Sequence, residues 1–127
     1  MGITPKELHY TKSHEWVRYI EETTVEVGIT DYAQKALGDI VFVNLPRVGD
    51  LVSIGEPIAD VESVKAVSDI YCPVTGTVIE VNEALSDAPQ LMNQEPYEAW
   101  IARINNVEEE EETMTAQEYD KFAAKEA

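Results

Sequence analysis

Lys65 is the residue best suited to chemistry in this sequence, because of the segment VESVKAVSD around it. Val64 and Ala66 on either side carry no charge, and Glu62 and Asp69 flank the turn at a distance. A lysine amine forms a stable amide, and its flexible stem lengthens any arm attached to it. Most lysines are only solvated surface groups. At an exposed turn, however, an acylating enzyme can reach the amine, so covalent attachment is the chemistry predicted for Lys65.

The other candidates for chemistry are two histidines and one cysteine. His9 and His14 are five residues apart and lie near no cysteine, so no metal site is predicted. Cys72 precedes Pro73 in a strand-like run, which is typical of a small buried apolar residue. A nucleophilic cysteine needs a histidine and an oxyanion site beside it, and the sequence indicates neither. A small enzyme that uses Cys72 or His14 remains an alternative from a different class.

The composition limits the classes of function. The 127 residues, 44% of them hydrophobic, suffice for one ordinary core, so residues 1–127 are predicted to form a single domain. The 25 acidic and 9 basic side chains give a formal charge of −16, which would repel nucleic acid and the anionic face of a membrane. No apolar run approaches the roughly 20 residues that span a bilayer.

The start of the chain and its single cysteine indicate the compartment. The first residues, MGITPKELHYTKSHEW, lack the apolar core of a signal peptide and the arginine-rich character of a transit peptide. One cysteine cannot form an intramolecular disulfide, which suits a reducing compartment. We therefore expect a cytoplasmic protein, or a mitochondrial matrix protein if the chain is a processed form.

Short β-prone runs separated by turn residues dominate the chain from about residue 10 to residue 104. Examples are residues 24–29, 40–45 and 78–81. Similar runs occur on both sides of Lys65, in VGDLVSIGEPIADVES and CPVTGTVIEVNEAL. Two such units can wrap around one core, as a flattened barrel or a two-sheet sandwich. The link between them is then a protruding hairpin with Lys65 at its tip, far from any pocket.

A short helix is predicted at residues 31–37, within the β core. Asp31 can cap its N-terminus, and Gln34, three residues on, can complete a capping box by bonding back to the cap residue. Gly38 can end the helix in the left-handed conformation. Further along, the segment SDAPQLMN contains Pro89, which permits only a brief helical turn.

The end of the chain is predicted to be an acidic linker followed by a helix. Like charges at residues 108–112 repel one another, which favours a solvated linker over a packed element. Thr115 and Glu118 then form a capping box for a helix at about residues 115–125. The face of this helix that is expected to pack on the sheet consists of Tyr119, Phe122 and Ala123.

The segment ADVESVKAVSDIYCPVTG resembles the lipoyl-attachment segment of the H proteins of the glycine cleavage system. The stretches YTKSHEWV, VGITDYAQKALGDIVFVNLP, PVTGTVIEVNEAL and NQEPYEAW resemble the same family in order and spacing, and with the tail EYDKF nearly the whole chain is covered. Other lipoyl domains share Glu-Ser-x-Lys, whereas SHEWV and GITDYAQ are more particular to H proteins. The resemblance implies a mainly β fold of the lipoyl-domain type (barrel-sandwich hybrid), with a short internal helix and a C-terminal helix.

The resemblance also implies a carrier with no catalytic residue of its own, with lipoate in amide linkage to Lys65. The residues of the attachment motif around it are Glu62, Ser63, Val64 and Ala66. The arm would take an aminomethyl group from glycine decarboxylase (P protein) to an aminomethyltransferase (T protein), and electrons to dihydrolipoyl dehydrogenase (L protein). A lipoyl ligase or octanoyl transferase would attach the group. Neither nucleic acid nor a membrane is an expected partner.

In the family the loaded arm can fold against the carrier, which shields its cargo from water. The matching positions for arm docking in this sequence are Ser13, Glu15, Ile29 and Asp69. Carboxylates at Glu15 and Asp69 can hold a cationic aminomethyl group. Both can equally be solvated acids in so acidic a chain. Ala36 departs from the family pattern, since some relatives have a histidine there.

Other carriers remain alternatives. A biotinyl domain typically has methionines beside its lysine, where this sequence has Val64 and Ala66. A lipoyl domain of a 2-oxo acid dehydrogenase usually continues into further domains. An H-like relay protein would accept lipoyl or octanoyl groups and donate them to other lipoyl-dependent enzymes.

Overall fold

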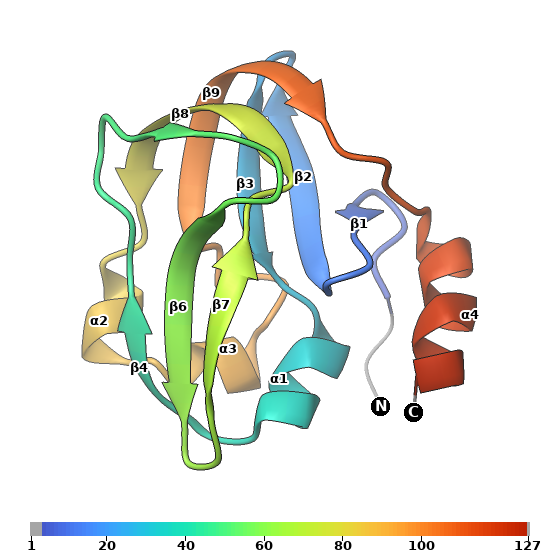
Figure 1. The fold of residues 1–127 in the computed structure, drawn as a ribbon. Helices are drawn as coiled ribbons and strands as arrows, with labels where there is room; N and C mark the ends of the chain where they lie inside the picture. Colours follow the sequence, from blue (N-terminus) through green and yellow to red (C-terminus); the bar gives the residue numbers. More distant parts are fainter. Residues whose placement is uncertain (1–3, 127) are drawn as a thin grey trace.

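Two antiparallel β-sheets form the body of the computed structural model, which describes residues 4–126 (Figure 1). Among these described residues, one sheet has six strands in the order β1-β2-β3-β9-β8-β5 and the other has three in the order β4-β6-β7. The strands of the larger sheet are β1 (His9–Tyr10), β2 (Glu15–Glu21), β3 (Thr24–Ile29), β5 (Leu51–Val52), β8 (Val74–Val81) and β9 (Ala102–Glu110). Those of the smaller sheet are β4 (Ile40–Asn44), β6 (Pro57–Ser63) and β7 (Val67–Tyr71). The predicted mainly β, two-sheet fold is confirmed.

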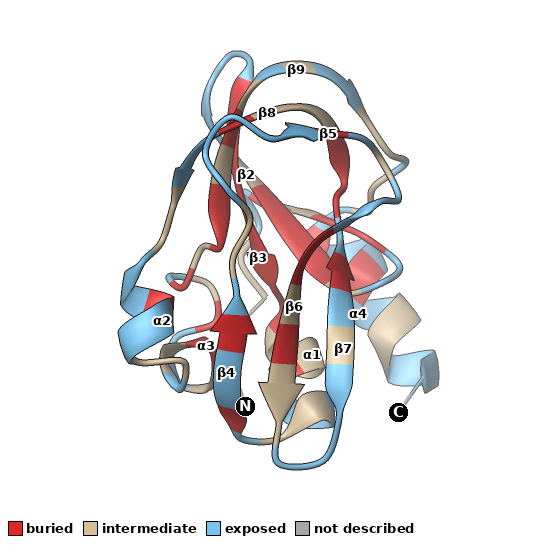
Figure 2. Cartoon of the chain, turned by 60° about the vertical axis from the view of Figure 1, so that its left-hand side comes forward, coloured by how far each residue is buried: buried red, intermediate tan, exposed pale blue. Residues whose placement is uncertain are grey.

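The hydrophobic core lies between the two sheets, as the buried segments in Figure 2 show. All six residues of β3 are buried, and this strand pairs with β2 on one side and β9 on the other. Valine and isoleucine pack well on pleated surfaces and supply much of the core. Buried examples from both sheets are Val25, Val27, Ile104, Val61 and Ile70. Each contributes roughly 1.5 to 3 kcal/mol relative to an exposed side chain.

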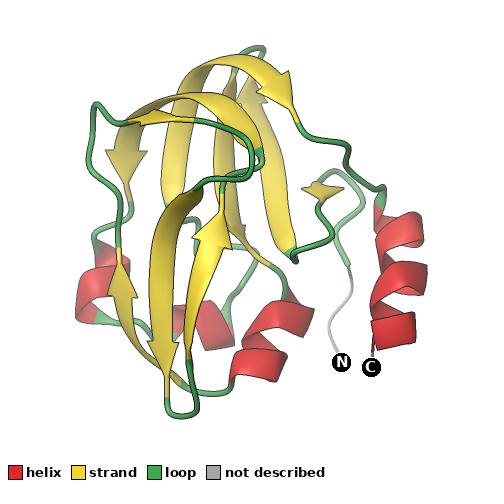
Figure 3. Ribbon diagram, viewed as in Figure 1, coloured by secondary structure: helices red, strands yellow, loops and turns green. Residues whose placement is uncertain are grey.

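The strands on either side of Lys65 pair with one another, as expected for the predicted hairpin. β6 pairs with β7, and β5 pairs with β8. The turn between β6 and β7 contains Lys65 and is the lowest point of the molecule in Figure 3. The protruding hairpin predicted from the sequence is therefore present.

The helices within residues 4–126 are short. They are α1 (Asp31–Leu37), α2 (Ala84–Asp87), α3 (Leu91–Gln94) and α4 (Ala116–Glu126). None of the helices in this described part of the chain has the length and apolar character needed to cross a membrane. Pro89 lies between α2 and α3, as expected for a residue that interrupts a helix.

The N-terminal cap of α1 differs from the prediction by one residue. Thr30, with an extended backbone, is the N-cap in place of Asp31, and its hydroxyl oxygen accepts the N–H of Ala33 at 3.2 Å. Asp31 begins the helix, and its Oδ1 accepts a hydrogen bond from the side-chain Nε2 of Gln34 at 2.8 Å. Threonine and aspartate both favour the cap position, so the sequence alone does not distinguish them. Gly38 ends α1 with φ +83° as predicted, but its ψ of −163° lies outside the left-handed helical region.

The acidic run at residues 108–112 differs from the predicted linker, because β9 continues through Glu110. In this strand Glu110 lies opposite Val74 of β8. Strand pairing uses only backbone groups, and Glu108 and Glu109 are exposed, so water and salt screen their repulsion. Glu110 also accepts a hydrogen bond from His9 Nδ1 at 2.9 Å, which holds this carboxylate in place.

The C-terminal helix α4 begins with the predicted capping box. The Glu118 N–H donates to Thr115 Oγ1 at 3.2 Å, and the Thr115 N–H donates to Glu118 Oε1 at 2.9 Å. α4 packs beside β1, at the edge of the larger sheet (Figure 1). Its buried Tyr119 joins a second apolar cluster with Tyr10 and Trp16. The expected packing of this helix on the sheet is confirmed.

Gly28 of β3 makes room for the buried indole of Trp16, its partner in β2. The Trp16 Nε1–H donates to the Pro96 carbonyl oxygen at 3.0 Å, which holds the ring in place. A Cβ atom at position 28 would overlap the ring. We expect Gly28→Ala to lower the free energy of unfolding by about 1 to 3 kcal/mol, measured by urea denaturation.

A Trp16→Phe background provides the control for this prediction. The smaller phenylalanine ring relieves the overlap, so Gly28→Ala should be less destabilising in that background than in the wild type. Equal losses of stability in the two backgrounds would contradict the explanation.

Candidate functional site

Ser63 closes the turn between β6 and β7. Its N–H donates to the Ala66 carbonyl oxygen at 2.8 Å, and its hydroxyl oxygen accepts the N–H groups of Lys65 and Ala66 at 3.2 and 3.1 Å. The Val64 N–H donates to the Asp39 carbonyl oxygen at 3.0 Å, which ties the turn to the segment after α1. Serine often bonds to backbone groups of turns in this way. The turn is therefore held in place although residues 64–66 are exposed.

The side chain of Lys65 lies on the surface against the end of α1. Its Nζ donates to the Ala36 carbonyl oxygen at 3.4 Å. A Cβ atom at Gly38 would come within 3.0 Å of Lys65 Cε, so the glycine leaves room for the lysine stem. Carbonyl groups in the last turn of a helix carry partial negative charge and attract cations. This exposed contact is long and weak, so it leaves the amine accessible to acylation.

A cavity of about 170 Å³ lies beside α1, and we call it the α1 pocket. It is lined by Ser13, His14, Glu15, Ile29, Tyr32, Ala33, Ala36, Leu37, Val61, Ser68, Asp69 and Ile70. Ala36 thus lines the pocket and also accepts a hydrogen bond from Lys65. The prediction that Lys65 lies far from any pocket is wrong, because the C-terminal end of α1 packs beside the hairpin tip.

The structure brings together all four residues expected to dock the arm, since Ser13, Glu15, Ile29 and Asp69 line the α1 pocket. Glu15 and Ile29 are register partners at the ends of β2 and β3. The sequence analysis missed most of the remaining wall. That wall includes the face of α1 formed by Tyr32, Ala33, Ala36 and Leu37. Their spacing of three and four residues marks one side of a helix and is the signal that predicts such a wall.

Glu15 is a buried acid with fixed hydrogen-bond partners. Only 2% of its surface is exposed, and the hydroxyl groups of Thr11 and Ser13 each donate to its Oε1 at 2.6 Å. Burial raises the pKa of Glu15 above its ordinary value of 4.5, and the hydrogen bonds from Ser13, Thr11 and the Tyr71 backbone oppose this rise. The alternative that Glu15 is merely a solvated acid is therefore wrong. Asp69, by contrast, is exposed at the rim of the α1 pocket.

Cys72 and His14 do not form a catalytic pair. The Cys72 Sγ–H donates to the Val74 carbonyl oxygen at 3.1 Å, and the residue is fully buried. Burial raises the pKa of the Cys72 thiol to about 11, so the thiolate is scarce near neutral pH. His14 instead bonds to Tyr119 and Glu126 of α4. The enzyme alternative built on these two residues is not favoured.

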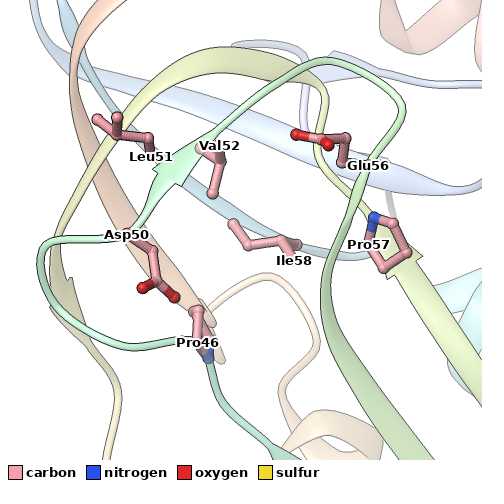
Figure 4. A pocket seen from close by; sticks show the side chains of 7 residues that line it. All are labelled: Pro46, Asp50, Leu51, Val52, Glu56, Pro57 and Ile58. Atoms are coloured by element: carbon pink, nitrogen blue, oxygen red, sulfur yellow. The ribbon is translucent and has the colours of Figure 1, made fainter.

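A second cavity, of about 300 Å³, lies at the opposite end of β6 (Figure 4). It is lined by Pro46, Asp50, Leu51, Val52, Glu56, Pro57 and Ile58. Pro57 begins β6 and Ser63 ends it, so the strand separates this cavity from the Lys65 turn by roughly 20 Å. Of these two cavities, the α1 pocket is the one that adjoins Lys65.

The raised pKa of Glu15 predicts a pH-dependent contribution to stability. The folded chain holds the Glu15 proton more tightly than the unfolded chain does, so this contribution is complete below pH 4.5 and is lost as the pH rises through the raised pKa. Glu15→Gln keeps an oxygen for the hydroxyl donors and cannot ionise. We expect the variant to lose less free energy of unfolding than the wild type between about pH 4 and about pH 8 in urea titrations.

Glu95→Gln is the matched control, because Glu95 is an exposed acid outside the α1 pocket. It should follow the wild-type pH dependence closely. If Glu15→Gln also followed the wild-type curve, burial would not be shifting the titration of Glu15.

Comparisons with known proteins show the family of the chain. The family model for the glycine cleavage H-protein matches residues 8–126. A glycine cleavage system H protein from Lachnoclostridium phytofermentans is 60% identical over 119 residues, which are 94% of this chain and 94% of that protein. A probable glycine cleavage system H protein from Pyrococcus abyssi is 60% identical over 118 residues, 91% of this chain and 88% of that protein.

A solved structure supports the same relationship. The crystal structure of a glycine cleavage system H protein from Mycobacterium marinum matches with a TM-score of 0.84 and 40% identity, over 96% of this chain and 98% of that one. The family match includes both sheets, the α1 pocket and α4. The chain therefore belongs to the glycine cleavage H-protein family, the lipoyl carriers of the glycine cleavage system.

Proposed function

We propose that Lys65 carries lipoate in amide linkage and presents it to the enzymes of the glycine cleavage system. The observation that supports this most is the exposed amine at the β6–β7 turn, within hydrogen-bonding distance of the rim of the α1 pocket. The lipoyl group supplies the reactive sulfur atoms and the redox chemistry. The chain supplies a rigid attachment point through Ser63 and a shelter beside it. The chain itself contributes no catalytic residue.

The α1 pocket is the proposed shelter for the loaded end of the arm. An aminomethyl amine is cationic near neutral pH, and Glu15 and Asp69 offer it two carboxylates. Thr11 and Ser13 already orient the Glu15 carboxylate, so little further ordering is needed on binding. A cation beside Glu15 favours its ionised form and opposes the effect of burial on its pKa.

The apolar lining of the α1 pocket supports the same role. Ile29, Val61 and Ile70 are buried side chains that line the pocket and limit the access of water. Electrostatic attraction is stronger where water is excluded, because the local dielectric constant is lower. Slower attack by water on the cargo is the expected consequence.

Recognition by the attaching enzyme is a separate role, which we assign to the turn itself. Glu62 is half-buried in β6, just before the turn, while Val64 and Ala66 are exposed on either side of Lys65. We propose that a lipoyl ligase or octanoyl transferase reads these residues. Because Ser63 closes the turn, it sets how the lysine is presented.

The proposed partners that use the arm are glycine decarboxylase, an aminomethyltransferase and dihydrolipoyl dehydrogenase. Tethering raises the concentration of the arm at each active site in turn. The charge of −16 favours partners with basic docking surfaces. Cys72 is a free, buried thiol, which supports a reducing compartment such as the cytoplasm.

Lys65→Arg tests the attachment residue. Arginine keeps the positive charge and cannot form the amide, so we expect no lipoylation and no glycine cleavage in an assay with the purified partner enzymes. The free energy of unfolding should change by less than about 0.5 kcal/mol, because an exposed turn residue contributes little to the core. Lys12→Arg, at another exposed lysine, should retain both modification and activity. Glycine cleavage by Lys65→Arg would contradict the proposal.

The double variant Glu15→Gln, Asp69→Asn tests the shelter. We expect normal lipoylation but faster loss of the cargo, because a charge-assisted contact contributes about 1.5 to 3 kcal/mol when shielded and less when partly exposed. The protein is loaded with glycine and the decarboxylase, the enzyme is removed, and the release of formaldehyde and ammonia is followed.

A second charge-neutralising pair is the control for the shelter. Asp87→Asn with Glu95→Gln removes two exposed acids outside the α1 pocket and should release the cargo at the wild-type rate. Equal release from the two double variants, at equal lipoylation, would show that Glu15 and Asp69 do not shelter the arm.

A further inference from the structure

A hydrogen-bond network joins the C-terminal helix α4 to the wall of the α1 pocket. The Tyr119 hydroxyl of α4 lies 2.7 Å from His14 Nδ1 and 2.7 Å from Thr30 Oγ1. His14 Nε2 lies 2.6 Å from Glu126 Oε1, also on α4. Tyr119 and Thr30 are buried, so these groups cannot exchange their partners for bulk water.

One assignment of hydrogens satisfies all the bonds of this hydrogen-bond network. Thr30 Oγ1 accepts the Ala33 N–H, so its own hydrogen is free to go to the Tyr119 oxygen. The Tyr119 hydrogen then goes to His14 Nδ1, and the hydrogen on His14 Nε2 goes to Glu126. In this assignment every member has a partner, with His14 Nδ1 as an acceptor and Nε2 as a donor.

Two members of this hydrogen-bond network, Thr30 and His14, shape both sides of the α1 pocket. Thr30 caps α1, whose Ala36 accepts the hydrogen bond from Lys65 Nζ. His14 lines the pocket beside Glu15, and its carbonyl oxygen accepts the Thr30 N–H at 3.1 Å. Tyr119 itself does not line the pocket. Its hydrogen bonds reach the pocket through His14 and Thr30.

The backbone of His14 needs such support. Its φ of +70° is uncommon for a residue with a side chain and persists only where the surroundings hold it. The imidazole packs against Tyr32 of α1 at 4.5 Å between ring centroids, and against Tyr119 at 5.7 Å. The hydrogen bonds to α4 thus hold a residue that precedes the buried acid Glu15.

We propose that Tyr119 is a positioning residue for the α1 pocket, which fixes the cap of α1 and the turn at His14 so that the pocket can hold the loaded arm. The proposal rests on the proposed function of the pocket. It gives α4 a role in the carrier reaction although this helix lies outside the pocket lining.

Amide exchange in the unlipoylated chain tests the positioning directly. Tyr119→Phe removes the hydroxyl and keeps the ring that stacks on Tyr10 at 4.8 Å. We expect the Ala33 amide to exchange at least about fivefold faster, relative to amides of β3, which matches a net hydrogen bond of about 1 kcal/mol. Tyr10→Phe is the matched control, because the Tyr10 hydroxyl donates to the Pro5 carbonyl oxygen, outside this hydrogen-bond network. Equal changes in the two variants would overturn the proposal.

The consequence for the arm is measured on the lipoylated chain. Tyr119→Phe should be lipoylated at the wild-type rate, yet release formaldehyde and ammonia at least about fivefold faster after loading with glycine and the decarboxylase. Tyr10→Phe should release them at the wild-type rate. This separation between modification and retention distinguishes positioning from a general loss of stability.

Substitutions at Thr30 test whether Tyr119 acts through it. Thr30→Ser keeps the hydroxyl and should retain wild-type release, whereas Thr30→Ala should release faster. Adding Tyr119→Phe to Thr30→Ala should have a smaller further effect than Tyr119→Phe has in the wild type, because only the bond to His14 remains to be lost. Full additivity would overturn the proposed route. If Glu15→Gln, Asp69→Asn releases formaldehyde and ammonia faster but Tyr119→Phe does not, the positioning role is contradicted and the shelter is supported. If Glu15→Gln, Asp69→Asn releases them at the wild-type rate, the proposed shelter itself is contradicted.

Discussion

The antiparallel pairing of β6 with β7 is the interaction on which the rest of the structure depends. Its register sets Glu62 opposite Val67 and leaves residues 64–66 to form the exposed turn. The same register directs Val61 and Ile70 inward, where they are buried and line the α1 pocket. Side chains alternate along a strand, so a slip of one residue would exchange the buried and exposed faces. One pairing therefore presents the lysine and builds a wall of the pocket beside it.

The two polar groups proposed for function lie in opposite environments. Lys65 is exposed and makes one long hydrogen bond, so its amine stays reachable. Glu15 is buried and held by two short hydrogen bonds, so its carboxylate is already oriented. A covalent arm must be free to leave the carrier, whereas a shelter works best when it is preorganised. The chain meets both needs by keeping the attachment point in a turn and the acid at the start of a strand.

Local patterns made the exposed hairpin at Lys65 predictable, because turn signals and valine-rich runs lie on both sides of it. The capping box at Thr115 was predictable because the spacing of Thr115 and Glu118 is itself a local pattern. The neighbourhood of the α1 pocket depends on how α1 packs beside the hairpin, which local patterns do not encode. The positive φ of His14 likewise depends on contacts that local patterns do not encode, because its hydrogen bonds to α4 join residues more than a hundred positions apart. The acidic run at residues 108–112 was misjudged because β9 continues through Glu110. Backbone pairing does not depend on side-chain charge, and repulsion between exposed carboxylates such as those of Glu108 and Glu109 is weak in water.

The central claim is that Lys65 is the point at which the lipoyl group joins the chain. Intact mass analysis followed by peptide mapping of the protein purified from its natural host tests this most directly. The account predicts the added mass of one lipoyl group, located on the peptide that contains Lys65. A lipoyl group on another lysine, or a biotinyl group at Lys65, would contradict it.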